Sequence, residues 1–120
     1  MRHLFVTQDY PPDHGGMARR HVELCRRFGA EPVVVSTVAS PRAPMFDANE
    51  CYPIERQPFG FAEAKLFTNQ LRWGRWLMTA CARGADVLHC ANVRPCGYAV
   101  WMTHRRTRTP YLLYVNGGDL

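Results

Sequence analysis

Lysine is nearly absent from this chain of 120 residues: Lys65 is the only one, and every other basic side chain is an arginine. Arginine therefore carries the net charge of +5, which suits bidentate contacts with phosphate or carboxylate groups. The arginines are scattered over several expected elements, without a single basic stripe and without a recognisable nucleic-acid-binding module. We therefore expect no nucleic-acid partner.

Paired cysteine motifs are missing as well. The chain has five cysteines, an odd number, and no Cys-x-x-Cys sequence; they are Cys25, Cys51, Cys81, Cys90 and Cys96. Neither a disulfide framework nor a zinc knuckle is indicated, and His89 beside Cys90 lacks the spacing of a zinc site. We expect reduced, mostly buried thiols, no metal and no cofactor.

Long hydrophobic runs are the third absence. No stretch reaches the ~18 apolar residues that a membrane-spanning helix needs, and Met1-Arg2-His3 leads into an apolar run without the pattern of a signal peptide. We expect a cytoplasmic protein, with peripheral contact at the inner membrane face as an extension of that prediction. The length allows one modest domain, residues 1–120.

Apolar runs of strand length alternate with stretches of helical periodicity, which favours a parallel sheet with crossover helices. Two prolines and small residues predict a loop over 39–49. The predicted strands are 3–8, 32–37, 52–55 (a short edge strand), 86–91 and 111–115; the predicted helices are 16–28, closed by Gly29, 62–83, and one from Pro95 or Gly97 to 106. The sequence therefore predicts an α/β fold: a Rossmann-like, doubly wound parallel sheet of about five strands with helices on both faces.

Two adjacent glycines join the first predicted strand to the first predicted helix. Gly15 and Gly16 allow a ligand to approach the main chain closely, and the helix behind them offers unpaired N–H groups to an anion. Proximity to phosphate is the functional interpretation of this pair. A tight strand-to-helix turn is the structural one.

If the first strand is central, three loops share the rim at the carboxyl ends of the strands, where open α/β sheets bind ligands. They carry Gly15 and Gly16, Asn92, and the run Asn116-Gly117-Gly118-Asp119. Arg19, in the first helical turn, opposes the helix dipole, which indicates either an anionic ligand or a carboxylate partner such as Asp119. Asp119 also fits the N-cap of a following helix.

The long predicted helix has an apolar side and a basic side. Its apolar side is formed by Phe67, Leu71, Leu77, Met78 and Cys81, and Lys65, Arg72 and Arg83 lie opposite. Trp76 falls on the basic side, where it either packs under the preceding loop or contacts a membrane surface. Arg105, Arg106 and Arg108 likewise fit a helix C-terminus favoured by its dipole, with anionic lipid as the alternative.

Three motifs together resemble a known family. Pro11-Pro12-x-x-Gly15-Gly16, the run Ala85-Asp86-Val87-Leu88-His89 and the run Tyr114-Val115-Asn116-Gly117-Gly118-Asp119 look like the amino-terminal half of the group 1 (family four) retaining glycosyltransferases. Their order along the chain matches that family. The similarity covers nearly the whole chain, with 40–57 the least distinctive part.

The resemblance implies the GT-B arrangement, two Rossmann-like domains facing across a cleft, and transfer of a sugar from a nucleotide diphosphate sugar to a sugar or lipid acceptor. The chain would be the amino-terminal, acceptor-side domain, with nothing matching the donor-binding domain, so we expect it to be inactive by itself. Asn116 stands where the family usually has a histidine that touches the donor sugar, and no catalytic residue is assigned. The resemblance and the rim together give the candidate substrate- or phosphate-binding residues: Gly15, Gly16, Arg19, Asn92, Asn116, Gly117 and Asp119.

Two enzyme classes fit the residues less well than a glycosyltransferase, and one non-catalytic function competes with it. A nicotinamide dehydrogenase would need Gly-x-Gly-x-x-Gly and an acid after the second strand, where Thr37-Val38 stand. A hydrolase would need a nucleophile on the strand-to-helix turn. The competing interpretation is a non-catalytic binding module for an acceptor, an anionic membrane surface or a partner chain. An open edge at the fifth strand also predicts self-association.

Overall fold

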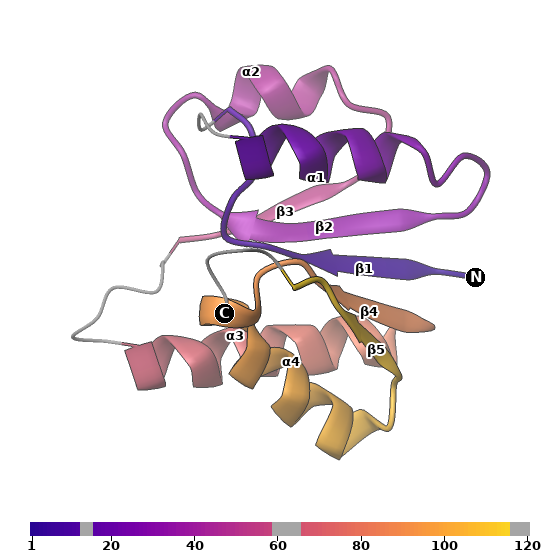
Figure 1. Ribbon diagram of the computed structural model, residues 1–120, viewed down its shortest axis with the longest axis vertical. Helices are drawn as coiled ribbons and strands as arrows, with labels where there is room; N and C mark the ends of the chain where they lie inside the picture. The colour runs from indigo at the N-terminus through magenta and orange to yellow at the C-terminus, as the bar shows by residue number, and fades with distance from the viewer. Residues whose placement is uncertain (13–15, 59–65, 116–120) are drawn as a thin grey trace.

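Strands and helices alternate along the chain in a computed structural model that describes residues 1–12, 16–58 and 66–115 (Figure 1). The order is β1 (His3–Val6), α1 (Gly16–Arg26), β2 (Val33–Val38), α2 (Ala43–Ala48), β3 (Ile54–Gln57), α3 (Leu66–Ala82), β4 (Val87–Cys90), α4 (Val93–Thr107) and β5 (Tyr111–Leu113). The predicted elements are all present, although their ends are shifted. The structure also has one helix, α2, that the sequence did not indicate.

The strands form one parallel sheet in the order β3-β2-β1-β4-β5. β1 is central, and its residue Phe5 lies opposite Val35 of β2 and His89 of β4. All four residues of β1 are buried, because helices cover both faces of a parallel sheet. The predicted Rossmann-like, doubly wound α/β fold is confirmed, and the first strand holds the central position on which the predicted rim depends.

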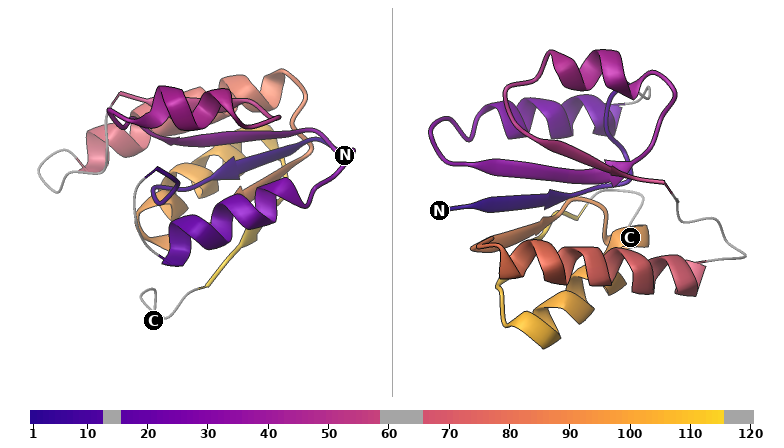
Figure 2. Two further views of the ribbon diagram at one scale, coloured as in Figure 1. Left: turned by 90° about the horizontal axis from the view of Figure 1, so that it is seen from above. Right: turned by 180° about the vertical axis from the view of Figure 1, so that it is seen from behind.

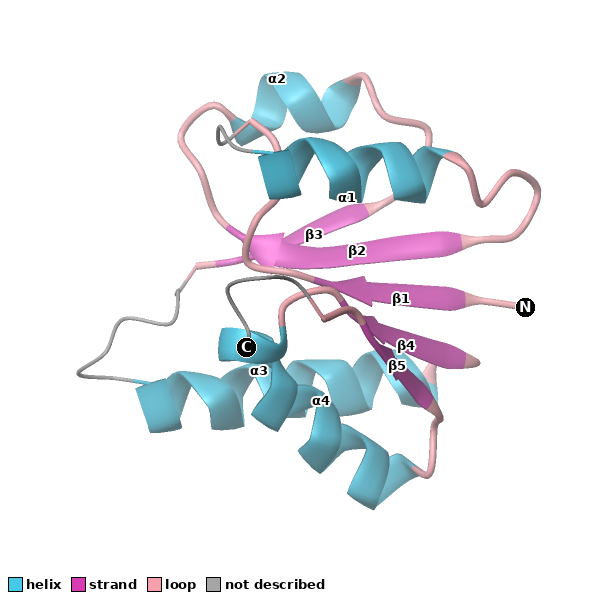
Figure 3. Cartoon of the chain, in the orientation of Figure 1, coloured by secondary structure: helices cyan, strands magenta, loops and turns pink. Residues whose placement is uncertain are grey.

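The helices form two layers, one on each face of the sheet. α1 and α2 cover one face, and α3 and α4 cover the other (Figures 2 and 3). The chain first builds outward from β1 through β2 to β3 and then returns past β1 to add β4 and β5. Because crossover connections are right-handed, this reversal of direction moves the following helices to the opposite face.

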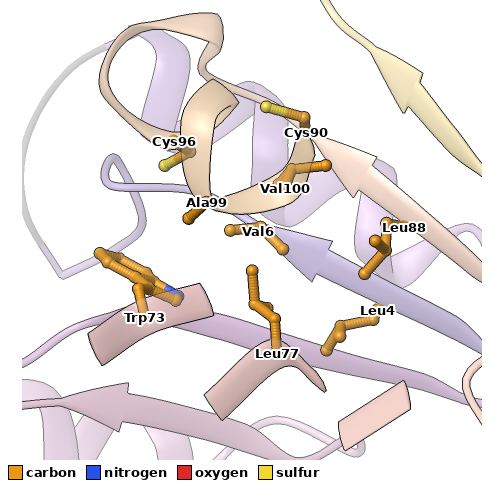
Figure 4. Packing of buried hydrophobic residues seen from close by; sticks show 9 residues of the cluster. All are labelled: Leu4, Val6, Trp73, Leu77, Leu88, Cys90, Cys96, Ala99 and Val100. Atoms are coloured by element: carbon orange, nitrogen blue, oxygen red, sulfur yellow. The ribbon is translucent and has the colours of Figure 1, made fainter. Parts of the chain in front are cut away.

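The core beneath α3 and α4 is centred on Trp73, which is completely buried (Figure 4). Trp73 and Leu77 project from α3 toward Val6 and Leu88 of the sheet. The indole N–H of Trp73 donates to Ser36 Oγ at 2.8 Å, which satisfies the one polar atom of the ring.

Gly74 lets α3 and α4 approach each other closely. A Cβ at this position would stand 2.2 Å from the terminal methyl of Met102 in α4. Thr103 of α4 donates its hydroxyl to Ala99 O at 2.8 Å and reaches Gly74 O at 3.4 Å. Side chains of α4 therefore pack directly against the backbone of α3 at this point.

The predicted buried side of the long helix is wrong in part. Phe67 and Leu71 are 66% and 36% exposed, whereas Trp73, which the predicted stripe omitted, is buried with Leu77. The helix is turned so that its largest aromatic ring fills the space above the sheet. Trp76 is half-buried and packs against the same core. The loop that directly precedes α3 lies outside the described residues, so its predicted contact with Trp76 is not tested.

The prediction of a loop over 39–49 is also wrong, because α2 occupies Ala43–Ala48. Pro44 lies in its first turn, where a missing N–H costs no helical hydrogen bond. The prolines that suggested a loop therefore mark a helix start. The left-handed conformation expected at Gly29 is confirmed, with φ of 64°.

The core beneath α1 and α2 contains a buried chain of hydrogen-bonded rings. His3 Nδ1 lies 2.8 Å from His89 Nε2, and His89 Nδ1 lies 2.6 Å from the hydroxyl of Tyr114. Phe28 stacks on His3, with ring centroids 4.3 Å apart, and His3 Nε2 faces the carboxylate of Glu31 at 3.3 Å. Only one proton fits between the two imidazoles, since two facing N–H groups would repel.

Burial lowers the pKa of His89 to about 4, and the neighbouring charge of His3 acts in the same direction. The unfolded chain, with an ordinary histidine pKa near 6.5, therefore binds more protons than the folded protein between pH 6.5 and pH 4. The stabilisation is fully present above pH 6.5 and is lost as the pH falls through this window.

We predict that the free energy of unfolding falls by up to about 3 kcal/mol between pH 6.5 and pH 4 through His89 alone. Urea denaturation followed by circular dichroism at a series of pH values measures this slope. His89→Gln removes the titrating ring, so its slope should be shallower across the same window. Equal slopes for the two proteins would contradict the assignment.

Candidate functional site

Polar side chains gather where β1 and β4 end, at the carboxyl rim of the sheet. The rim consists of the segment from Thr7 to Pro12, which leads from β1 toward α1, and of Asn92, between β4 and α4. The topology brings these two segments together because β1 and β4 pair in parallel, with Val6 opposite Cys90. The predicted meeting of the first loop and Asn92 at one rim is confirmed.

Asn92 fastens the two segments to each other. Its Oδ1 accepts hydrogen bonds from the hydroxyl of Thr7 at 2.5 Å and from the backbone N–H of Gln8 at 2.8 Å. Its Nδ2 donates to the carboxylate of Asp9 at 3.0 Å. Asn92 is only 2% exposed, and it makes no capping bond to α4 although it holds the N-cap position. Its side chain is therefore used to position the loop.

His21 of α1 completes this network from the opposite side. Its Nδ1 lies 2.7 Å from the carbonyl oxygen of Asp9 and 3.0 Å from Thr7 Oγ1. A carbonyl only accepts, so Nδ1 carries the proton and donates to it. Burial lowers the pKa of His21, against the opposing effect of Asp9, so the neutral imidazole is favoured. The first loop is thus anchored to α1 as well as to β4.

Arg56 of β3 holds the far end of the same loop. One terminal nitrogen donates to Pro11 O at 2.6 Å and to Asp47 at 3.0 Å, and the other donates to Val38 O at 3.0 Å. The guanidinium is 8% exposed and pairs with the Asp47 carboxylate of α2. One buried arginine therefore joins the first loop, the end of β2 and α2.

Two further polar atoms lie buried at the same rim. Gln8 Oε1 and Thr37 Oγ1 have no hydrogen-bond partner among residues 1–12, 16–58 and 66–115. Gln8 follows β1, and Thr37 lies near the end of β2. Both atoms are buried, so they do not form part of the exposed surface of the rim.

Gly16 is the first residue of α1 and is exposed. A Cβ at this position would meet no described atom within 4 Å. Packing against the described residues therefore does not demand a glycine here. The backbone N–H groups in the first turn of a helix are the groups that contact a phosphate at such sites.

Arg19 is exposed on the first turn of α1, on the solvent side of the helix. Its partner, whether a ligand or Asp119, is not decided, because Asp119 lies outside the described residues. The same holds for three other candidates: Gly15, Asn116 and Gly117. Of the seven candidate residues, the structure thus places Gly16, Arg19 and Asn92.

Sequence reasoning missed the residues that shape the rim. Thr7, Asp9, His21 and Arg56 were not among the candidate residues. Polar residues directly after an apolar strand were the available signal for the first two. No signal indicated Arg56, because its partners come from three separate segments of the chain.

A cavity of about 280 Å³ lies at the opposite end of the sheet, lined by Arg2, Pro32, Val34, Ala80, Arg83 and neighbouring residues. These residues stand at the amino ends of β1 and β2 and at the end of α3. The cavity is therefore separate from the rim. At the rim, the described residues offer hydrogen-bonding groups and the N-terminus of α1.

One cysteine contacts the rim: the buried Cys90 thiol lies 3.4 Å from the carbonyl oxygen of Asn92. Cys25, Cys90 and Cys96 are buried, Cys81 is half-buried and Cys51 is exposed, and all are free thiols. Burial raises the pKa of Cys25 to about 12, so this thiol is not a nucleophile near neutral pH. Among the described residues, no group of three metal-ligating side chains comes together.

Comparison with known proteins adds no relative: no protein-family model matches the chain, and no curated protein matches it significantly. Within the described part of the chain, no helix is both long and apolar enough to cross a membrane. The assignment that the fold supports is a Rossmann-like α/β domain with a polar rim at the carboxyl ends of β1 and β4.

We predict that Asn92→Ala lowers the free energy of unfolding by about 2–3 kcal/mol, because it leaves the Gln8 N–H and the Thr7 hydroxyl without their acceptor. Urea denaturation measures the loss. Asn49→Ala is the matched control, since Asn49 makes one exposed bond to Met45 O and should cost less than about 0.5 kcal/mol. Equal losses in both variants would show that the network does not fix the loop.

Proposed function

We propose that the chain is the amino-terminal, acceptor-side domain of a retaining GT-B glycosyltransferase, with its carboxyl rim forming one wall of the cleft. The donor would be a nucleotide diphosphate sugar and the acceptor a sugar or a lipid-linked sugar. Asn116 and Gly117 would meet the donor sugar, as their place in the family motif implies. No cofactor or metal is included in this proposal.

The observation that carries the proposal is the place of the three motifs in the fold. Because the sheet is parallel, the carboxyl ends of β1, β4 and β5 lie at the same edge. The first motif begins after β1 and the third begins after β5, whereas the second leads into β4 and forms most of it, and Asn92 follows that strand. A doubly wound sheet binds ligands there, beside the point where the strand order reverses. Gly16 at the start of α1 supports a phosphate contact, because a helix N-terminus offers unpaired backbone N–H groups and this residue has no side chain to cover them.

The described rim residues would position the ligand-binding loop rather than react. Asn92, Thr7 and His21 fix the start of the loop, and Arg56 fixes Pro11. A fixed loop lowers the entropy that is lost when a ligand binds. In GT-B enzymes the facing domain supplies the other cleft wall, so catalysis depends on both domains while binding can be tested on this one.

A non-catalytic binding module is the second candidate. The observation that favours it is the chemistry of the described rim, which offers hydrogen-bonding groups and backbone amides and, among the residues described there, no exposed thiol. Such a surface suits the binding of a polar ligand without catalysis of a reaction. The two candidates differ in whether a nucleoside diphosphate binds.

We expect UDP, GDP or ADP to bind the purified chain in isothermal titration calorimetry. Gly16→Val should weaken that binding at least about tenfold, because a branched side chain blocks the approach to the helix start. Gly97→Ala is the matched control: its Cβ makes an ordinary 3.6 Å contact with Val93, so binding should persist. A folded chain that binds none of the three diphosphates would favour the non-catalytic module.

We also propose that the chain self-associates through β5. Within the described residues β5 pairs only with β4 and forms an edge of the sheet, and Leu112 and Leu113 are 52% and 49% exposed. An apolar edge strand invites pairing with a second copy.

Sedimentation velocity over a concentration series should therefore show concentration-dependent association. Leu112→Lys should reduce it by adding charge at the edge, while the conservative Leu112→Val should retain it. A monomer at every concentration would contradict self-association.

A further inference from the structure

The outer surface of the α3 and α4 layer carries a row of exposed aromatic rings. Phe67 of α3 lies beside Tyr98 of α4, with ring centroids 6.3 Å apart, and Tyr98 lies beside Trp101 at 5.9 Å. The three rings are 66%, 44% and 46% exposed. A contiguous group of exposed rings on one face is the usual mark of an interaction surface.

These rings are not the outer part of the core. Trp73 and Leu77 project from α3 to the sheet, and Ala99 and Val100 face the same core from α4 (Figure 4). Phe67 and Leu71, one helical turn apart, lie on a different side of α3 and remain exposed. The sheet therefore satisfies the apolar side of each helix and leaves a second group of apolar side chains uncovered.

Arginines continue the same stripes along both helices. Arg75 follows Leu71 by four residues on α3, and Arg105 follows Trp101 by four residues on α4. The guanidinium carbon of Arg105 lies 6.0 Å from the centroid of the Trp101 ring. Arg75, Arg105 and Arg106 are all exposed. The patch defined here as the aromatic–arginine face consists of Phe67, Leu71, Arg75, Tyr98, Trp101, Arg105 and Arg106.

Carboxylates are absent from both helices that form this face. The 17 residues of α3 and the 15 residues of α4 contain five arginines and neither aspartate nor glutamate. In contrast, α1 and α2 on the opposite face contain Glu23 and Asp47. The dipole of α4 accounts for basic residues in its last turn, but it does not account for the mid-helix Arg75 or for the lack of acids in both helices.

We propose that the aromatic–arginine face binds the surface of an anionic lipid bilayer. Aromatic rings suit the boundary between headgroups and acyl chains, and arginines beside them suit lipid phosphates and anionic headgroups. Charge complementarity selects this occupant: an uncharged apolar partner would not require arginine without any acid. None of the residues that define the face belongs to the carboxyl rim.

The test uses the purified chain and vesicles of two compositions, pure phosphatidylcholine and equal parts of phosphatidylcholine and phosphatidylglycerol. Co-sedimentation should show binding to the anionic vesicles and little to the neutral ones, and added salt should weaken it. Emission of Trp101, the one of the three tryptophans that is exposed in the structure, should shift to shorter wavelength on binding.

Variants locate the binding face. Arg105→Gln with Arg106→Gln should weaken the partition coefficient roughly twenty-fold, at about fivefold for each charge. Trp101→Ser should weaken it roughly tenfold, and Trp101→Phe should abolish most of the emission shift while retaining binding. Matched controls on the other layer, Arg27→Gln and Met45→Ser, remove an exposed charge and an exposed apolar side chain and should bind as the unchanged chain does.

Three results would overturn the proposal. One is equal binding to neutral and anionic vesicles. Another is equal loss in the variants of the face and in the two controls, which would show a general effect of charge or apolar area. The third is absence of vesicle binding together with loss of self-association in Trp101→Ser, which would identify the face as a contact between copies. Circular dichroism of each variant confirms that it is folded.

Discussion

The central position of β1 is the constraint on which the other elements depend. Its backbone pairs with β2 on one side and with β4 on the other, and its four side chains are buried on both faces. A strand in this position cannot satisfy its hydrogen bonds or its apolar surface by itself. The two halves of the chain must therefore assemble on opposite sides of it, which places one pair of helices on each face of the sheet.

Where β1 ends, buried polar groups replace apolar packing. Leu4, Phe5 and Val6 need only neighbours of the right shape, whereas Thr7 and the N–H of Gln8 need specific acceptors. Because an unpaired buried donor costs more free energy than a hydrogen bond returns, the amide of Asn92 fixes the loop in one arrangement. The segment after β1, which belongs to the proposed ligand-binding rim, is thus fixed at its base.

The two helical layers differ in charge although they serve the same sheet. In the α1 and α2 layer, acids form ion pairs with arginines. Glu50, which follows α2, pairs with Arg26 of α1, and Asp47 of α2 pairs with Arg56 of β3. The α3 and α4 layer contains arginines without any acid. Packing on the sheet does not require this asymmetry, since the buried sides of both layers are mostly apolar. The difference in charge is therefore a property of the outer surfaces of the two layers, which are the surfaces that a partner contacts.

The sequence by itself determined the fold class and the strand order, because apolar runs such as Leu4-Phe5-Val6 alternate with helical periods and only a few arrangements bury them. It also placed Asn92 at the rim, since the residue follows a strand. Only the tertiary structure decided which side of α3 is buried, because both Trp73 and Phe67 are large aromatic residues and only Trp73 finds its packing partners and an acceptor for its N–H in the folded sheet. It also decided the role of Arg56, whose partners lie far apart in the chain and meet only once the strands have paired.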